Sequence, residues 1–221
     1  MFGKNSKVDM ELNRDVERFL HQCAKENGGL LPIVQAGEPV LRQPTVPYTG
    51  QLSKKTMAKL IEAMRVTMLE APGVGLASTQ VGINLSFAVL EDHTSEEYAD
   101  DPREFAEFPF HVIINPSYEP VEGSATAEFF EGCLSVAGWQ AVRKRYVDII
   151  ARWQDEDGER HEEHLHGWPA RIFQHETDHL SGELYIDKAI IRSLTSDENL
   201  DDYWIEDPVP TEAAKELGFE L

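Results

Sequence analysis

The spacing of apolar residues predicts two amphipathic helices in the first third of the chain. Apolar side chains recur at helical spacing through residues 8–27, and Gly28-Gly29 end the pattern. A second stripe runs through residues 53–70, where Ser53 is suited to cap the helix. The apolar positions are Val8, Leu12, Val16, Phe19, Leu20 and Cys23, then Met57, Leu60, Ile61, Met64 and Met68. Four prolines between residues 32 and 50 predict extended or turning chain between the helices.

The middle of the chain has the pattern of short strands. Strands are predicted at residues 85–90, 111–114, 125–130 and 146–153. A turn-forming stretch follows, "DEDGER", and predicts a hairpin whose second strand covers residues 160–165. The acidic residues 91–107 are expected to form a surface loop. The most basic stretch, "VRKRY" at residues 142–146, is interpreted as the solvated start of a strand.

A third helix is predicted from "GWPAR" onward, where Pro169 suits the first turn, and it should end near Gly182. The acidic tail after Lys188 is expected to pack loosely through apolar side chains, or to be mobile in part. Those side chains are Tyr203, Trp204 and Ile205. Strands before and around one helix, without alternation of strand and helix, predict an α+β fold.

Composition narrows the function classes. The chain has 221 residues and two distant cysteines, which fits a reducing compartment better than a disulfide-stapled secreted domain. Its formal net charge of −20 repels nucleic acid and anionic lipid surfaces, so neither is expected as a partner. The first residues lack an apolar signal region, and no apolar run is long enough to span a bilayer. A cytoplasmic location is expected.

The third helix carries the first chemical motif, His-Glu-x-x-His at residues 175–179. Positions i and i+4 share one helix face, so His175 and His179 can offer imidazole nitrogens to one ion. Glu176 projects about 100° further round and can reach a water bound to that ion, as a general base would. The helix alone leaves an alternative open, two core histidines beside a surface glutamate.

The third ligand decides the class of enzyme. A metzincin motif requires a third histidine ten residues after the first, and Tyr185 stands there. Glu183 and Asp187 lack the long-helix context of a thermolysin-type ligand. Upstream, "FEGCLSV" places Cys133 at a strand end, where its thiolate would complete a Cys-His-His site with one open position. A buried free cysteine is the alternative interpretation of Cys133.

Hydrolysis of a carbonyl also requires donors for the developing oxyanion. The segment "GVGLASTQ", residues 73–80, has glycines that allow close approach of a ligand to the backbone, and Gln80 ends it with an amide donor. It is not a phosphate loop, because no third glycine and no Gly-Lys-Ser/Thr follow. A capped turn is the alternative interpretation of Gln80.

Together, "GVGLASTQ", "EGCLS" and "QHETDHLSG" resemble the three motifs of the peptide deformylase family, in the same order. That family has Gly-x-Gly-Leu-Ala-Ala-x-Gln, Glu-Gly-Cys-Leu-Ser and Gln-His-Glu-x-x-His. The resemblance covers about residues 31–188. It implies antiparallel sheets packed around a central metal-binding helix, with N-terminal helices and a C-terminal extension. It also implies a metallohydrolase that removes the N-formyl group from N-formylmethionyl nascent peptides and releases formate.

The resemblance assigns residues as well. It implies that Cys133, His175 and His179 hold Fe²⁺, with Zn²⁺, Ni²⁺ or Co²⁺ as substitutes, and that Glu176 is the acid/base. The implied oxyanion donors are Gln80 and the Leu134 backbone N–H. The implied peptide-binding residues are Val74 and Gly75, with Trp168 and Ile172 near the methionine pocket. The corresponding division of the chain is an N-terminal helical extension at 1–30, a catalytic domain at 31–190 and an acidic tail at 191–221.

Three positions depart from the family pattern. Ser78 replaces a usual alanine, Ala137 a common proline, and Gln140 a common arginine near the substrate. The departures at Ala137 and Gln140 bear on peptide preference and efficiency, not on the metal. Two alternatives therefore stay open, a zincin-type metalloendopeptidase and a non-catalytic deformylase-like peptide-binding protein. Transient proximity to the ribosome is expected, but the tail is acidic, so the basic ribosome-docking helix of some relatives is not carried over.

Overall fold

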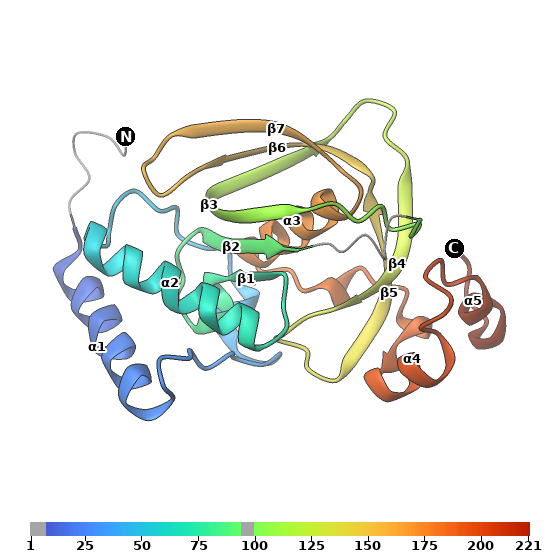
Figure 1. Cartoon of the computed structure of the whole chain (residues 1–221), viewed down its shortest axis with the longest axis horizontal. Coiled ribbons are helices and arrows are strands. Elements are labelled where there is room, and N and C mark those ends of the chain that lie inside the picture. Colours follow the sequence, from blue (N-terminus) through green and yellow to red (C-terminus); the bar gives the residue numbers. More distant parts are fainter. Residues whose placement is uncertain (1–7, 94–99) are drawn as a thin grey trace.

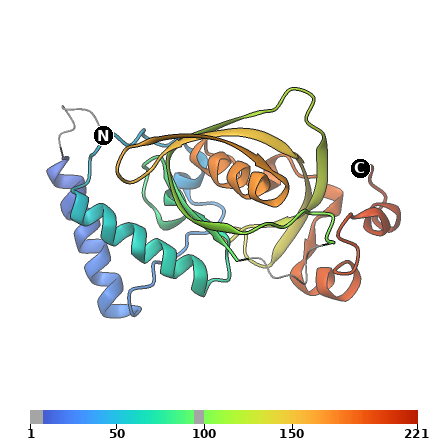
Figure 2. The same cartoon turned by 45° about the horizontal axis from the view of Figure 1, so that its top comes forward.

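A computed structural model of the chain describes residues 8–93 and 100–221. Within these residues two antiparallel sheets enclose one helix, α3 (Gly167–Leu180), which contacts both of them (Figures 1 and 2). One sheet has the strand order β1-β2-β3-β6-β7 and the other β4-β5-β8. The strands are β1 (Gly75–Ala77), β2 (Phe87–Asp92), β3 (Phe108–Pro120), β4 (Thr126–Gly132), β5 (Trp139–Tyr146), β6 (Asp148–Gln154), β7 (Arg160–His166) and β8 (Thr195–Ser196). The α+β prediction, with sheets around a central helix, is confirmed.

The two N-terminal helices lie side by side at one end of the molecule (Figure 1). They are α1 (Met10–Glu26) and α2 (Lys54–Glu70). The Ser53 side chain accepts from the Thr56 N–H, so the predicted cap of α2 is present. The apolar stripe of α2 is buried, and Met64 and Met68 are fully so, in a core that also contains β1 and β2 side chains. Burial of this stripe fixes α2 against the sheet that contains β1 and β2.

The hairpin predicted from "DEDGER" connects β6 and β7, which pair in register from Asp148–His166 to Gln154–Arg160. Gly158 in its turn has a φ of +80°, a conformation that favours glycine. Short 3-10 turns occupy Pro39–Arg42, Ser78–Val81, Tyr185–Asp187 and Ile191–Ser193. Of the expected acidic loop at 91–107, residues 94–99 lie outside the described residues, as do residues 1–7 of the expected N-terminal extension.

Two expectations about the surface were wrong. The basic stretch at 142–146 forms the second half of strand β5, not the start of a strand, and Arg143 and Arg145 are each only 4% exposed. Their guanidinium groups pair with acidic side chains that are buried or partly buried, which the local pattern did not reveal: Arg145 Nη1 lies 2.8 Å from Asp178 Oδ2, and Arg143 Nη2 lies 2.7 Å from Glu183 Oε1. A charged side chain is buried only where it is paired, and these partners are distant in sequence.

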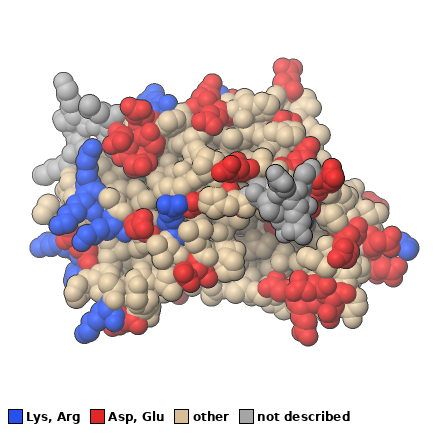
Figure 3. All heavy atoms as spheres, in the orientation of Figure 1, with Lys and Arg blue, Asp and Glu red and all other residues tan. Residues whose placement is uncertain are grey.

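The expectation for the tail was wrong in part. The tail forms α4 (Asp197–Tyr203) and α5 (Thr211–Leu217), and β8 before them pairs with β5. Of the three expected anchors, Tyr203 and Ile205 are 67% and 54% exposed and do not anchor it, whereas Trp204 is partly buried. Leu200, Ala213 and Ala214 are buried instead. In the sequence, these few small apolar residues gave no clear pattern among the many acidic ones. The acidic side chains gather over this end of the molecule (Figure 3).

No helix among residues 8–93 and 100–221 is long and apolar enough to cross a membrane.

Candidate metal centre and active site

The three expected metal ligands converge. Cys133 follows the end of β4, while His175 and His179 lie one turn apart on α3. The Cys133 Sγ atom and one nitrogen of each imidazole lie within 4.8 Å of one another. Cys133 Sγ is 3.3 Å from His179 Nε2, and the two imidazole centroids are 4.9 Å apart. Within the described part of the chain, this is the one group of three such side chains close enough to share an ion.

A buried carboxylate orients one of the histidines. Glu131 Oε2 lies 3.1 Å from His175 Nδ1, which leaves His175 Nε2 available to an ion. Burial acts to raise the pKa of Glu131, but the charges of Arg145 and Arg171 and the bond to His175 outweigh it and hold that pKa well below its usual range. The sequence interpretation missed this residue. Its signal was the glutamate of "EGC", two residues before the ligand on a strand.

The two imidazoles have opposite electrostatic surroundings. Burial disfavours the charged form of His175, but hydrogen bonds to Cys133 and Glu131 dominate and raise its pKa to about 10. Burial lowers the pKa of His179 well below its usual value, and the charges of His175 and Arg145 lower it further. His179 is therefore a neutral imidazole. The negative groups that hold a proton on His175 are the same groups that favour a metal cation in its place.

Glu176 is a buried carboxyl group beside the ligands. It is 4% exposed, and its Oε2 is buried with no hydrogen-bond partner in the described residues. Burial raises its pKa to about 7, against the lowering effect of the His175 and Arg145 charges. The β1 backbone packs so closely on it that a Cβ on Gly75 would collide with its carboxylate. A carboxyl group of this pKa can both accept and return a proton near neutral pH.

Gln80 presents its amide NH₂ to the same centre. The Ala77 N–H donates to Gln80 Oε1 at 2.8 Å, which fixes the orientation of the amide. Gln80 Nε2 then lies 3.5 Å from Cys133 Sγ and 3.2 Å from Ser135 Oγ. The backbone N–H of Leu134 donates to no protein group in residues 8–93 and 100–221. Both groups are thus donors that border the ligand Cys133.

The expected peptide-binding residues also come together. Val74 and Trp168 pack against the hydrophobic core cluster that contains Ile172. Ile172 itself is 3% exposed. Trp168 is held by a hydrogen bond from its Nε1 to Asp92 Oδ2 at 2.6 Å. Gly75 lies on β1, which is an edge strand of its sheet, and β4 is an edge strand of the other. Exposed strand edges offer main-chain groups to an extended peptide.

Comparisons with known proteins agree on one family. Residues 30–194 match the family model described as polypeptide deformylase. The chain belongs to the polypeptide deformylase family. A peptide deformylase of Bifidobacterium adolescentis is 72% identical over 221 residues and covers 100% of both chains. Peptide deformylase 1 of Streptomyces coelicolor is 51% identical over 195 residues, 88% of each chain.

Solved deformylase structures have the same fold. The Met-ala-ser bound class I type b peptide deformylase of Acinetobacter baumannii matches with a TM-score of 0.64 and 32% identity, over 72% of this chain and 98% of that one. The peptide deformylase of Thermotoga maritima matches with a TM-score of 0.61 and 35% identity, over 72% of this chain. The chain is therefore a metal-dependent hydrolase that removes the N-formyl group from N-formylmethionyl peptides during N-terminal processing of proteins.

The donor set of this deformylase fits a divalent transition metal. A thiolate sulfur and two imidazole nitrogens are ligands that such ions bind, and three protein ligands leave a position open for chemistry. The fit also agrees with the orientation of His175 by Glu131 and with the neutral imidazole of His179. The endopeptidase alternative is not supported. Tyr185, at the metzincin position, is buried, and its hydroxyl donates to the Trp139 carbonyl at 2.8 Å.

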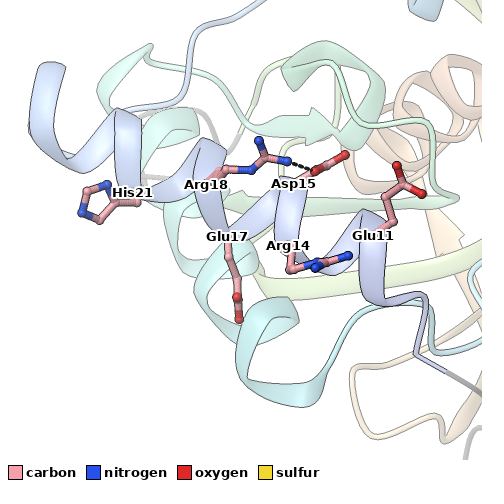
Figure 4. A pocket seen from close by; sticks show the side chains of 6 residues that line it. All are labelled: Glu11, Arg14, Asp15, Glu17, Arg18 and His21. Carbon is pink, nitrogen blue, oxygen red and sulfur yellow. Dashed lines mark hydrogen bonds and ion pairs between the residues drawn. The ribbon is translucent and has the colours of Figure 1, made fainter.

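A surface hollow of the deformylase, of about 640 Å³, lies elsewhere (Figure 4). Its described lining residues all belong to α1, and Arg18 forms an ion pair there with Asp15. Its walls are exposed charged side chains of one helix face, so it has no counterpart to the convergent ligands of the Cys133 centre.

Proposed function

We propose that Cys133, His175 and His179 bind the catalytic ion and that Glu176 moves the protons of the reaction. The observation that carries this proposal is the convergence of three ligand side chains beside a buried, unpartnered carboxyl group with a pKa of about 7. A divalent ion bound there supplies Lewis acidity, which polarises the formyl carbonyl and makes water a nucleophile at neutral pH. The protein groups supply proton transfer, orientation and charge stabilisation.

The steps follow from the positions of these side chains. Glu176 accepts a proton from the attacking water while the new C–O bond forms at the formyl carbon. The negative charge that develops on the formyl oxygen is met by Gln80 Nε2–H and the Leu134 N–H. Glu176 then gives its proton to the methionine nitrogen as the C–N bond breaks. Formate and a free amino terminus leave, and Glu176 is ready for another cycle.

The substrate is proposed to bind as an added strand. The free edges of β1 and β4 flank the centre, so an extended peptide can bond to the Val74–Gly75 backbone. The absence of a side chain at Gly75 leaves room for Glu176, and so for a close approach of the peptide to it. The methionine side chain is proposed to enter the apolar surroundings of Val74, Trp168 and Ile172.

We propose ferrous iron as the ion in the cell, with zinc, nickel or cobalt able to substitute. Sulfur and imidazole ligands suit all four ions, so the ligands do not select one of them. The proposal of iron rests on the resemblance to the family. The proposal extends to a cytoplasmic enzyme that meets nascent chains near the ribosome without docking through its acidic tail. The three-part division of the chain, 1–30, 31–190 and 191–221, stays a prediction. A fractionation that recovered the protein outside the cytoplasm would contradict the proposed location.

Metal retention by ligand variants tests the proposed site. Enzyme is prepared without oxygen, and its metal content and formate release from formyl-Met-Ala-Ser are measured on one sample. Cys133→Ala, His175→Ala and His179→Ala are each expected to lose the ion and the activity. His164→Ala is the matched control, because His164 is an exposed histidine that pairs with Asp148 on the far strands β6 and β7. Full metal content in any of the three ligand variants would contradict the proposed ligand set.

A further inference from the structure

A short segment of main chain joins the two proposed oxyanion donors. The Val34 N–H donates to the Gln80 carbonyl at 2.9 Å. Two residues on, the Ala36 N–H donates to the Ser135 carbonyl at 2.7 Å. Gln80 lies in the segment that follows β1 of one sheet, and Ser135 lies in the segment that follows β4 of the other. Residues 33–36 therefore fix how far apart these two segments lie.

Gln35, at the centre of this segment, adds a clamp through its side chain. Its Nε2 donates to the Leu134 carbonyl at 2.9 Å, and its Oε1 accepts from the Ala137 N–H at 3.3 Å. Both ends of one amide are thus used on the turn that follows Cys133. That turn is closed by the Val136 N–H, which donates to the Cys133 carbonyl at 2.8 Å. Leu134, whose N–H is the proposed donor, is a central residue of the turn.

We propose that Gln35 is a positioning residue for the oxyanion hole. The inference rests on the proposed function of Gln80 and Leu134. A donor stabilises a developing charge best when it is held in place before the reaction, because no reorganisation is then needed. The Leu134 N–H shares its peptide plane with the Cys133 carbonyl, which accepts from the Val136 N–H. Gln35 holds the next peptide plane through the Leu134 carbonyl, and so restrains the turn that presents the Leu134 N–H. Gln35 makes its hydrogen bonds to Leu134 and Ala137 and none to the ligand Cys133, so metal binding is expected not to depend on the clamp.

Ala137 makes the clamp possible. A proline there would have no N–H to offer Gln35, and proline is the residue common at this place in the resembling family. The next turn along the chain, residues 136–139, suits proline: Gly138 has a φ of +84°, as the third residue of a type II turn does, and proline is favoured at the second. Proline would restrain the chain directly after the Cys133–Val136 turn through its ring, whereas this chain restrains it through Gln35.

Steady-state formate release from formyl-Met-Ala-Ser by the ferrous enzyme tests the clamp. Gln35→Ala is expected to lower kcat about three- to tenfold, with KM and metal content unchanged. Gln35→Glu keeps the acceptor for the Ala137 N–H but sets a carboxylate oxygen against the Leu134 carbonyl, so its kcat should fall at least as far. Gln43→Ala, an exposed glutamine on the same connecting segment, is the control and should match the wild type.

Ala137→Pro supplies the rescue that a merely structural role of Gln35 would not give. In the Gln35→Ala background, Ala137→Pro is expected to restore most of the lost kcat, because the ring replaces the clamp. An unchanged kcat in Gln35→Ala, or a kcat loss that Ala137→Pro does not reduce, contradicts the inference while leaving the proposed function intact. A wild-type enzyme that binds metal but releases no formate contradicts the proposed function, and the role of Gln35 with it.

Discussion

Glu131 and His175 form the link between the metal centre and the charged interior: Glu131 Oε2 lies 3.1 Å from His175 Nδ1, and its Oε1 lies 2.6 Å from Arg145 Nε. Both residues of this link are buried or nearly so, and Arg171 also binds Glu131. One carboxylate thereby selects the imidazole nitrogen that faces the ion and pairs with two buried guanidinium groups. The Glu131 side chain therefore contributes both to metal binding and to the stability of the fold.

Glu131→Gln should weaken metal binding and destabilise the fold. A partner that orients a ligating histidine is worth about 10- to 100-fold in metal affinity, so metal competition with a chelator should show a loss of that size. The free energy of unfolding should fall by about 3–5 kcal/mol, because Arg171 loses its buried counter-charge and Arg145 keeps only that of Asp178. Glu128→Gln is the control, since Glu128 lies on the same strand but pairs with the half-exposed Lys144. Unchanged metal affinity in Glu131→Gln would refute the orienting role.

Gly75→Ala should abolish most activity without loss of the fold. The added Cβ would collide with the Glu176 carboxylate, which must shift from its position beside the ligands. Gly73→Ala gives a graded comparison, because its Cβ would meet Leu134 Cδ1 at 2.8 Å, the end of a side chain that can move. Formate release and thermal unfolding are measured on both variants. Equal activity in Gly75→Ala and wild type would show that Glu176 does not need this position.

The pH dependence of kcat/KM should report Glu176. It must be deprotonated to accept a proton, so activity rises with pH through its pKa. Burial raises that pKa from 4.5 to about 7, and a bound cation lowers it again, so the acid limb is expected between these two values. An acid limb below pH 4.5 in the metal-loaded enzyme would be inconsistent with a buried general base.

A surface cluster should give a different pH signature, in stability alone. His164 Nε2 and His166 Nδ1 lie 2.8 and 2.9 Å from Asp148 Oδ1, and these bonds raise the pKa of His166 above 6.5 and lower that of Asp148 below 3.8. The His166 contribution is present below pH 6.5 and is lost as pH rises through its folded-state pKa. The Asp148 contribution is present above pH 3.8 and is lost as pH falls through its own.

Asp148→Asn should therefore lower the free energy of unfolding most between about pH 4 and 6.5, by less than about 1 kcal/mol because the histidines are exposed. Above pH 8 the variant and the wild type should converge. Urea unfolding at several pH values measures this, with Asp157→Asn on the connecting turn as the control. A constant difference across the whole range would show that the cluster does not titrate with folding.

Much of the fold was predictable because its signals are local. Helical spacing and the Ser53 cap identified α2 to within a residue, and a turn-forming stretch identified the β6–β7 hairpin. The ligands were predictable for the same reason, since His175 and His179 share a helix face by spacing alone. Cys133 needed the further context of three motifs in order, because a lone cysteine carries no such signal.

The rest depended on contacts between distant segments. Arg143 and Arg145 looked solvated because their acidic partners, Asp178 and Glu183, lie more than one element away. Glu131 is only two residues from Cys133 in the sequence, but it becomes the partner of His175 only because β4 and α3 come together in the fold. Gln35 is further still, and its clamp on Leu134 joins residues 99 positions apart. Sequence patterns indicate helices, strands and metal ligands. The residues that hold those ligands in place, such as Glu131, can be identified only from the folded structure.

The central claim is that Glu176 moves protons in a site whose ion is held by other residues. Formate release from formyl-Met-Ala-Ser and metal content, measured together on wild type and Glu176→Ala prepared without oxygen, test it most directly. One ion per chain is expected in both proteins, with rapid formate release by the wild type and almost none by the variant. A variant that keeps its ion and still turns over at a wild-type rate would show that Glu176 does not move the protons.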